Sequence, residues 1–266
     1  MSGDARGGRE RWRRREAPLK PPGPGRLVVG LQPVREAIRR HGSALHEVLI
    51  DGRRSPKLDA LARFAADQAV PSVRDVTRSE LDQLARGVTH QGVAALAPEL
   101  ELLTLDALLA DTAPLGLALD SLQDPQNFGA VVRSAVALGG VTIVWGEHSS
   151  APLTPATFRA SAGAIEHARL CRVSSLHEAL AALRDRDVQV IGLDPTAPTK
   201  LSECTLTAPA VLVLGGEGEG LSRAVRRTCT TLATLGGLAS IDSLNASVAA
   251  GIALYEALRQ RTKSAG

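Results

Sequence analysis

The sequence predicts an α/β protein of two domains, and three observations lead to this prediction. First, short apolar runs alternate with segments whose apolar residues recur at helical spacing. Second, the strand segments of the C-terminal half are unbroken apolar runs, which is typical of a parallel sheet covered by helices on both faces. Third, a Leu-rich, acidic segment bounded by Pro98 and Pro114 separates the two halves. The 266 residues are enough to bury two such cores.

Residues 26–98 are expected to form the first domain, a small α/β unit. Its strands are predicted at residues 26–30, 45–51, 71–76 and 90–97, and its helices at 33–40, 57–69 and 77–85. Thr77 and Glu80 are spaced as a capping box, in which each side chain bonds the backbone N–H of the other residue. Residues 99–114 are expected to be a linker that contains one short helix.

Residues 115–266 are expected to form the second domain, an open α/β sheet with helices on both faces. Its strands are predicted at 115–121, 141–146, 168–173, 188–194, 210–217 and 231–235, and its helices at 127–139, 154–165, 175–186, 222–229 and 243–261. Ser175 and Glu178 have the spacing of a second capping box. Ligands of such sheets bind outside the carboxyl ends of the strands, so functional residues are expected there.

The basic charge of the chain is concentrated in a Pro- and Gly-rich N-terminal arm, residues 1–25. The first 26 residues carry eight Lys and Arg against three acidic residues, whereas the remainder carries 23 basic and 25 acidic residues. Because the arm lacks apolar periodicity, we expect it to be disordered. Such an arm is typical of contact with RNA or DNA; the alternative is a solvated terminus.

The cysteines, histidines and apolar runs indicate the redox compartment of the protein and whether it has a metal site or a membrane segment. Cys171, Cys204 and Cys229 lack CxxC spacing, so free thiols in a reducing compartment are expected. The six histidines have no ligand spacing with the cysteines, which predicts no metal site. No apolar run is long enough for a membrane helix, and no apolar segment of a signal peptide follows the N-terminal arginines. We therefore expect a soluble, cytoplasmic protein without a membrane partner.

The stretch DPQNFGAVVRSA, residues 124–135, joins a turn to a helix that is apolar nearly all round. Asn127 is predicted as the N-cap of that helix. A helix without a polar stripe is typically buried, so Arg133 is expected to be buried or half-buried and to need an anionic partner. That partner is either an internal carboxylate, such as Glu217, or a ligand phosphate.

The stretch LGGEGEGLS, residues 214–222, is rich in glycine but matches neither common phosphate loop. A Walker loop requires Gly-Lys-Ser/Thr, which is absent, and the glycine spacing does not fit the dinucleotide fingerprint of a nicotinamide-dependent dehydrogenase. Glu217 and Glu219 also disfavour phosphate. They suit a ligand that approaches the backbone closely and carries positive charge or sugar hydroxyls. The alternative is a tight turn with exposed acids.

The stretch SLNAS, residues 243–247, precedes the last helix, and Ser243 or Asn245 is predicted to cap it. Taken together, DPQNFGAVVRSA, GGEGEGLS and SLNASVAAGI resemble the three motifs of the SpoU (TrmH) family. These are the S-adenosylmethionine-dependent RNA 2'-O-ribose methyltransferases of the SPOUT class. The resemblance covers residues 115–262. VVGLQPVREAI (28–38) and HQGVAALA (90–97) are similar to the ribosomal-protein-like RNA-binding domain of the RlmB-type members. Both halves imply a guanosine-2'-O-methyltransferase of large-subunit (23S) ribosomal RNA.

The resemblance implies a SPOUT-type knotted sheet, S-adenosylmethionine as cofactor and a homodimer through the C-terminal domain. The last helix offers apolar residues for that dimer: Ile252, Leu254, Tyr255 and Leu258. The implied catalytic residues are Arg133, Asn127, Glu217, Ser243 and Asn245. The implied cofactor-binding residues are Gly192, Gly215, Gly216, Glu217, Gly220, Leu235, Leu244, Asn245 and Ser247.

Arg133 of one subunit is expected near the cofactor of the other. A guanidinium does not deprotonate in proteins. We therefore expect Arg133 to pair with the target phosphate and to lower the pKa of the ribose hydroxyl, rather than to act as a base.

One segment departs from the family pattern. Leu235-Gly236-Gly237 stands where the family usually has Ile-Pro-Met, a segment that lines the adenine pocket through backbone groups. Two alternatives stay open: a tRNA or another rRNA nucleotide as substrate, and a catalytically silent RNA-binding assembly factor of the same fold. The intact residues Asn127, Arg133, Glu217 and Asn245 argue against the silent factor.

Overall fold

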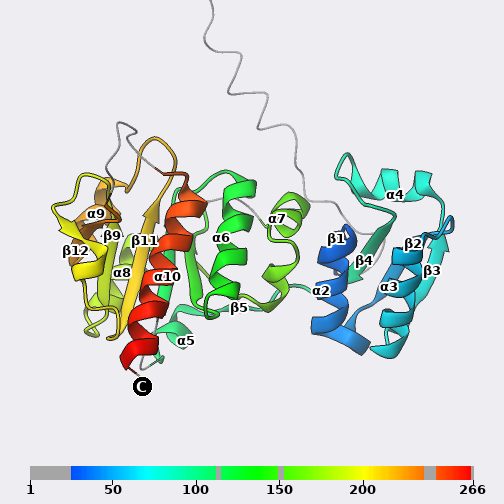
Figure 1. Cartoon of the computed structure of the whole chain (residues 1–266), viewed down its shortest axis with the longest axis horizontal. Coiled ribbons are helices and arrows are strands. Elements are labelled where there is room, and N and C mark those ends of the chain that lie inside the picture. Colours follow the sequence, from blue (N-terminus) through cyan, green and yellow to red (C-terminus); the bar gives the residue numbers. More distant parts are fainter. Residues whose placement is uncertain (1–24, 112–114, 149–152, 237–243, 265–266) are drawn as a thin grey trace, which may run out of the picture. The chain divides into compact units, whose positions relative to one another are not determined.

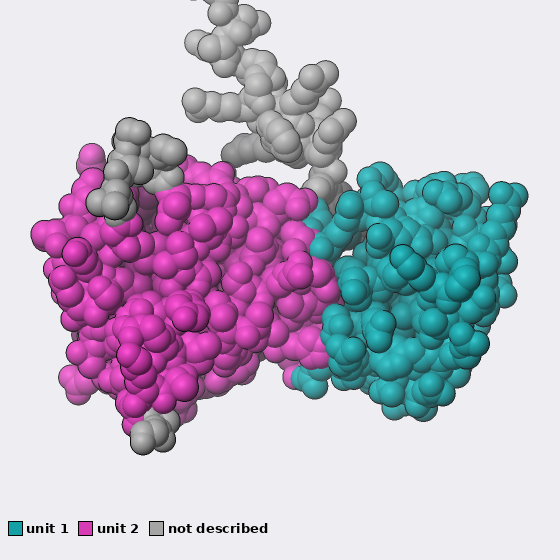
Figure 2. All heavy atoms as spheres, viewed as in Figure 1, with its two compact units in different colours: residues 1–99, 154–159 teal, residues 100–153, 160–266 magenta. Residues whose placement is uncertain are grey.

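The computed structural model describes residues 25–111, 115–148, 153–236 and 244–264 (Figure 1). The chain forms two compact units, which Figure 2 distinguishes by colour. Unit 1 comprises Met1–Glu99 and the short segment Thr154–Arg159, and unit 2 comprises Leu100–Leu153 and Ala160–Gly266. The segment Thr154–Arg159, expected within the second domain, therefore groups with unit 1, where the Arg26 guanidinium lies 5.0 Å from the centre of the Phe158 ring.

Unit 1 is built on a four-stranded sheet in the order β1-β4-β2-β3. Strand β4 is antiparallel to both β1 and β2, and β2 is parallel to β3. The predicted strands and helices are all present: β1 (Arg26–Val29), α2 (Leu31–His41), β2 (Glu47–Asp51), α3 (Pro56–Asp67), β3 (Val73–Val76), α4 (Arg78–Ala85) and β4 (Val93–Ala97).

Both faces of this sheet are buried because successive side chains of a strand point to opposite faces. Val28 packs in a core with residues of α2 and α3, whereas its neighbours Leu27 and Val29 pack in a second core with residues of α4. The capping box of α4 is confirmed: the Thr77 N–H donates to Glu80 Oε2 at 2.7 Å, and the Glu80 N–H donates to Thr77 Oγ1 at 3.3 Å.

Unit 2 contains an eight-stranded sheet in the order β10-β12-β9-β11-β6-β7-β8-β5. Every neighbouring pair is parallel, as predicted. The strands are β5 (Leu102–Leu103), β6 (Leu115–Asp120), β7 (Thr142–Gly146), β8 (Arg169–Val173), β9 (Gln189–Leu193), β10 (Thr199–Lys200), β11 (Ala210–Gly215) and β12 (Thr231–Thr234). The edge strands β5 and β10 were not predicted, because two residues are too few to show a pattern.

Helices cover both faces of this sheet. They are α5 (Leu105–Leu109), α6 (Pro125–Ala137), α8 (Leu176–Arg184), α9 (Arg223–Thr228) and α10 (Ala246–Ser264). Helix α7 (Pro155–Ala160) falls, except for its last residue, in the segment that groups with unit 1. Helices α6 and α10 pack side by side over one face (Figure 1). Leu108 of α5, Leu180 of α8 and Val225 of α9 share a core with strand residues on the other face.

The local predictions for residues 154–165 and for the cap at Ser175 are wrong. The helix expected at 154–165 ends at Ala160, because Ala162 and Gly163 have φ values of 51° and 85°, which no α-helix accommodates. A 3₁₀ turn, Ala164–His167, follows. Ser175 precedes α8 without a side-chain capping bond; its Oγ instead lies 3.0 Å from His177 Nδ1.

The parallel arrangement brings the carboxyl ends of β6, β9, β11 and β12 to one edge of the sheet, and these four strands are neighbours in it. Within the described residues, no helix is long and apolar enough to cross a membrane.

Candidate active site

Three motifs that lie far apart in the sequence meet at this edge through a chain of side-chain hydrogen bonds. Asn245 Nδ2, directly before α10, donates to Asn127 Oδ1 of α6 at 3.0 Å. Asn127 Nδ2 donates in turn to Glu217 Oε1 in the loop after β11. Glu217 and Asn245 are exposed and Asn127 is half-buried, so a ligand can reach the cluster.

The sequence predicted Asn127 as the N-cap of α6, and this prediction is wrong. The helix begins two residues earlier, at Pro125, and Asp124 is the N-cap: its carboxylate accepts from the backbone N–H groups of Gln126 at 3.0 Å and Asn127 at 3.3 Å. Pro suits the first helical position, where no intrahelical N–H bond is lost. Because Asp124 satisfies the helix terminus, the Asn127 side chain is available to the other two motifs.

Asn245 caps α10 and also takes part in the cluster. Its Oδ1 accepts from the Ser247 N–H at 2.9 Å and from Ser247 Oγ at 2.6 Å. Asn245 thus fixes the start of α10 and points its Nδ2 toward α6. Leu244 beside it is half exposed, and Ser243 lies outside the described residues.

The glycine-rich loop after β11 is a closed turn. Gly216 and Gly220 form an isolated antiparallel bridge, in which the Gly220 N–H donates to the Gly216 carbonyl at 3.1 Å. A Cβ on Gly215 would lie 2.2 Å from the carbonyl carbon of Gly220, so glycine is required there by the turn itself. Glu217 and Glu219 are both exposed on this turn.

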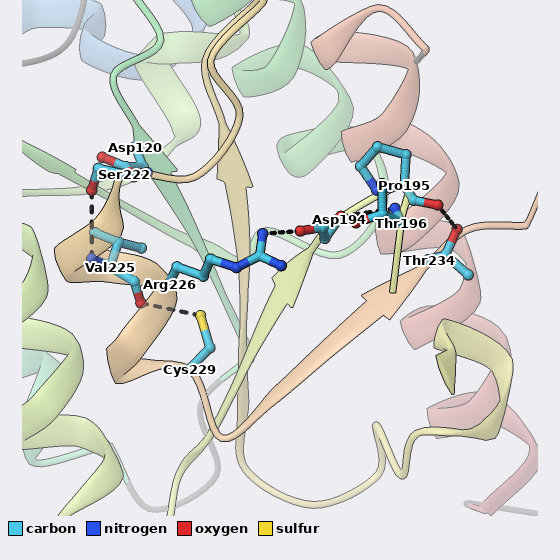
Figure 3. Close-up of polar contacts among 9 residues, drawn as sticks. All are labelled: Asp120, Asp194, Pro195, Thr196, Ser222, Val225, Arg226, Cys229 and Thr234. Carbon is cyan, nitrogen blue, oxygen red and sulfur yellow. Dashed lines mark hydrogen bonds and ion pairs between the residues drawn. The ribbon is translucent and has the colours of Figure 1, made fainter. Parts of the chain in front are cut away.

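Asp120 anchors the far end of the loop, a role that the sequence analysis missed. This buried carboxylate ends β6, and its Oδ2 accepts from the Ser222 N–H at 2.6 Å. Ser222 in turn caps α9 through a bond from the Val225 N–H to its hydroxyl at 3.4 Å (Figure 3). Asp194, buried directly after β9, was missed as well. For both Asp120 and Asp194, the sequence feature that could have identified the residue is a single acidic side chain at the end of a buried apolar strand.

The predicted burial of Arg133 is wrong. The buried face of α6 is formed by Phe128, Gly129, Val131, Val132 and Ala135, and Arg133 lies outside it with an exposed side chain. Within the described part of the chain, its guanidinium makes no hydrogen bond or ion pair. Glu217, the internal partner considered for it, contacts Asn127 instead.

Gly192 and Cys229 lie behind the loop rather than on its surface. A Cβ on Gly192 would stand 2.8 Å from Cys229 Sγ, from Leu221 and from Leu232, so the packing of the protein itself requires glycine here. Burial raises the pKa of Cys229 to about 11, which keeps the thiol protonated, and the Sγ donates to the Val225 carbonyl at 3.3 Å.

The described residues contain no cluster of three or more His, Cys, Asp or Glu side chains that could hold a metal ion. The edge thus presents exposed carboxylates, amides and backbone groups of a glycine turn.

In an open α/β sheet, ligands bind in the crevice outside the carboxyl ends of the strands, so this edge defines the expected ligand-binding site of the protein. The chain belongs to the SpoU rRNA methylase family, whose model matches residues 114–255. A second model, for the substrate-binding domain of RNA 2'-O ribose methyltransferases, matches residues 27–103. The protein is an RNA 2'-O-methyltransferase that uses S-adenosylmethionine.

Relatives and solved structures agree with this assignment. An uncharacterized tRNA/rRNA methyltransferase of Mycobacterium sp. (strain KMS) is 38% identical over 242 residues, which are 88% of this chain and 76% of the relative. The 23S rRNA (guanosine-2'-O-)-methyltransferase RlmB of Pseudomonas putida is 36% identical over 240 residues, 88% of this chain and 96% of the relative. The SpoU methyltransferase AviRb of Streptomyces viridochromogenes, solved in complex with AdoMet, superposes with a TM-score of 0.75 at 28% identity, covering 89% and 90% of the two chains.

The residues at the edge fit this cofactor. Apart from the adjacent residues of the chain, no described atom lies within 4 Å of the position that a Cβ would take on Gly218, Gly220 or Gly236, so open space lies beside the backbone there. Glu217 and Glu219 supply negative charge, which attracts a sulfonium cation.

Proposed function

We propose that this protein methylates the 2'-oxygen of a guanosine ribose in 23S ribosomal RNA. The observation that carries the proposal is the Asn127–Glu217–Asn245 cluster, which joins all three motifs at the ligand-binding edge. The likeness to a 23S rRNA (guanosine-2'-O-)-methyltransferase over 96% of that relative's length supports the choice of substrate.

When bound, S-adenosylmethionine would supply an electrophilic methyl group. Its transfer to the ribose 2'-oxygen would release the hydroxyl proton and leave S-adenosylhomocysteine. The protein has to orient the hydroxyl and assist this proton loss. In our proposal the amide of Asn127, held between Glu217 and Asn245, orients the ribose. Ser243 completes this set of residues.

Arg133 is proposed to bind the phosphate of the target nucleotide. Its exposed guanidinium, without an ion pair in the described part of the chain, is available to a ligand. A fixed positive charge next to the ribose stabilises the alkoxide that develops in the transition state, and thereby lowers the pKa of the hydroxyl.

The cofactor is proposed to lie against the loops after β9, β11 and β12 and the start of α10. The residues assigned to it are Gly192, Gly215, Gly216, Glu217, Gly220, Leu235, Leu244, Asn245 and Ser247. Since Gly192 is enclosed by side chains, it contributes through its backbone and through the close packing that it permits. A trefoil knot around these loops is also proposed, on the family resemblance.

A homodimer through α10 is proposed, because this helix leaves an apolar stripe uncovered. The stripe consists of Leu244, Val248, Ile252, Tyr255 and Leu258, all exposed. Leu254, expected on this face, is buried in the unit itself. Helix α10 packs along α6, so a partner on the stripe would bring a second α6, with its Arg133, close to the first site.

Methylation of defined RNAs tests the substrate. The purified protein should transfer a labelled methyl group to 23S rRNA from a strain that lacks the corresponding gene, and mapping should locate one 2'-O-methylguanosine. Transfer to tRNA, or to another rRNA nucleotide, would contradict the proposed substrate. If S-adenosylmethionine binds but no RNA is methylated, the assembly-factor alternative is supported instead.

A further inference from the structure

A chain of polar contacts connects three segments behind the proposed cofactor site (Figure 3). It begins at Arg226 of α9, which donates through Nη1 to Asp194 directly after β9. It continues at Thr234, the last residue of β12, whose Oγ1 donates to the Pro195 carbonyl at 3.4 Å. It ends at Gly236, whose N–H donates to the same Thr234 Oγ1 at 3.2 Å. One hydroxyl therefore bridges the loop after β9 and the segment after β12.

The Asp194 end of this chain is buried and charged. Its side chain is 7% exposed, and besides Arg226 it accepts from the Thr196 N–H at 2.8 Å and Thr196 Oγ1 at 2.6 Å. Burial acts to raise the pKa of this carboxyl, but the bonds from Thr196 and Arg226 outweigh it and hold the pKa below its ordinary value. Asp194 therefore stays ionised and fixes both its own loop and α9.

The Gly236 end lacks any intrinsic restraint. Gly236 has a φ of 78°, in the left-handed region, and apart from its chain neighbours no described residue comes within 4 Å of the position that a Cβ would take. Where a proline would fix φ, glycine leaves the backbone free. The bond from its N–H to Thr234 Oγ1 ties Gly236 to strand β12.

These three segments are adjacent in the sequence to residues that the proposed function assigns to the cofactor. Helix α9 follows the glycine turn, Asp194 follows Gly192 by two residues, and Thr234 precedes Leu235. Neither Thr234 nor Arg226 is itself among the proposed cofactor contacts. Fixing a binding loop before the ligand arrives increases affinity, since less conformational freedom is lost on binding.

We propose that Thr234 is a positioning residue for S-adenosylmethionine, which acts by holding the Leu235-Gly236 segment against the loop that Asp194 and Arg226 fix. The inference rests on the proposed function, which places the cofactor at this edge. It predicts an effect on cofactor affinity and none on the transfer step once the cofactor is bound.

The test compares Thr234→Val with Thr234→Ser by calorimetric titration of S-adenosylmethionine into the RNA-free protein. Valine keeps the branched shape but removes both hydrogen bonds, so we expect a Kd about tenfold higher, equivalent to about 1.4 kcal/mol. Serine keeps the hydroxyl and should restore the Kd to within about twofold. At saturating cofactor, kcat should be unchanged in both variants. Thr231→Val, at the other end of the same strand, is the matched control and should bind normally.

A Kd for folded Thr234→Val within about twofold of the wild type overturns the inference, as does equal weakening in the serine variant. If Thr234→Val does not fold, Arg226→Gln tests the inference instead. The Arg226 side chain is partly exposed, so it can be replaced without removing a packed group. A raised Kd at unchanged kcat then supports the inference, and a normal Kd rejects it. If the wild type itself does not bind S-adenosylmethionine, the proposed function fails rather than this inference alone.

Discussion

Arg133 carries the sharpest prediction at the scale of single residues. Because its side chain is exposed and makes no ion pair within the described residues, Arg133→Ala should change the free energy of unfolding by no more than about 0.5 kcal/mol. Because we propose that this charge acts on the transition state, its loss should lower methyl transfer by about 100-fold or more. Arg133→Lys should also be impaired, because lysine lacks the planar fork that binds a phosphate at two points.

Thermal unfolding and a methylation assay on the same preparations check this prediction. Arg186→Ala, another exposed arginine of unit 2, is the matched control and should keep full activity. Substantial residual transfer by Arg133→Ala, or a melting temperature several degrees lower, would show that Arg133 has a structural rather than a catalytic role.

Asn127 yields a second residue-scale prediction. Asn127→Ala removes the group that joins Glu217 to Asn245, yet leaves Asp124 to cap α6. We therefore expect a loss of transfer of at least about tenfold, with a change in stability below about 1 kcal/mol. Asp124→Ala is the informative comparison, because loss of the cap should cost about 1 kcal/mol of stability. Equal destabilisation by both variants would contradict the separation of cap and site.

At the same scale, the sequence identified the motif residues but not their supports. Asn127, Glu217 and Asn245 stand in recognisable motifs, whereas Asp120 and Asp194 are single carboxylates whose partners lie 102 and 32 residues away. The burial of Arg133 was misjudged because Ala and Val also occupy half-exposed positions of α6, so apolar composition alone does not mark the buried face.

Among the elements, α10 is held at its C-terminal end by a dense polar network. Arg261 donates to the Leu206 carbonyl at 2.8 Å and the Ala208 carbonyl at 2.9 Å, and Gln260 Oε1 accepts from the Leu206 N–H at 2.9 Å. Glu256 accepts two bonds from Arg259, both at 2.7 Å, and one from Gln260. These bonds from Arg259 and Gln260 lower the pKa of Glu256 from 4.5 to about 2.

A depressed carboxyl pKa contributes stability that is fully present above the unfolded-state value, about 4.5, and is lost as the pH falls toward 2. Because Arg259 is partly exposed, solvent screening limits the contribution to about 1 kcal/mol. Glu256→Gln should therefore be less stable than the wild type at pH 7, and the difference should shrink between pH 4.5 and pH 3. Urea unfolding at several pH values measures it, with the exposed Glu178→Gln as control. A difference that does not depend on pH would contradict the assignment.

The uncovered stripe on α10 gives a second prediction for this helix. Tyr255 is 59% exposed, and a carboxylate at the centre of an apolar dimer contact would be buried without a partner. Tyr255→Glu should therefore give a monomer at micromolar concentration by light scattering, with methyl transfer lost because we propose that Arg133 acts across the dimer. Ser264→Glu, nine residues on and about two and a half turns away, should stay dimeric. A wild type that is already monomeric would exclude the dimer.

For the whole molecule, periodicity predicted which segments are strands and helices, and the unbroken apolar runs predicted that the large sheet is parallel. The order of strands was not predictable, because it depends on long-range packing that local patterns do not encode. Thr154–Arg159 illustrates this limit: its helical pattern is local, but its grouping with unit 1 arises from a neighbour more than 100 residues earlier in the chain, Arg26.

The N-terminal arm carries the prediction that concerns the molecule as a whole. Residues 1–24 hold seven Lys and Arg against three acidic residues, whereas the chain beyond residue 26 has more acidic than basic residues. Each cation that neutralises a phosphate of single-stranded RNA adds about 0.7 to the slope of log K against log salt. If about half of the seven contact phosphates, removal of residues 1–24 should flatten that slope by about two to three and weaken binding most at low salt.

Titration of a labelled 23S rRNA fragment at several salt concentrations measures the slope directly. A full-length variant in which the six arginines between residues 6 and 15 become glutamine separates charge from length and should behave like the truncation. Transfer at saturating RNA should be unchanged in both, because the arm is distant in sequence from all three motifs. An unchanged slope in the two variants would mean that the arm is a solvated terminus, and that units 1 and 2 bind the RNA without it.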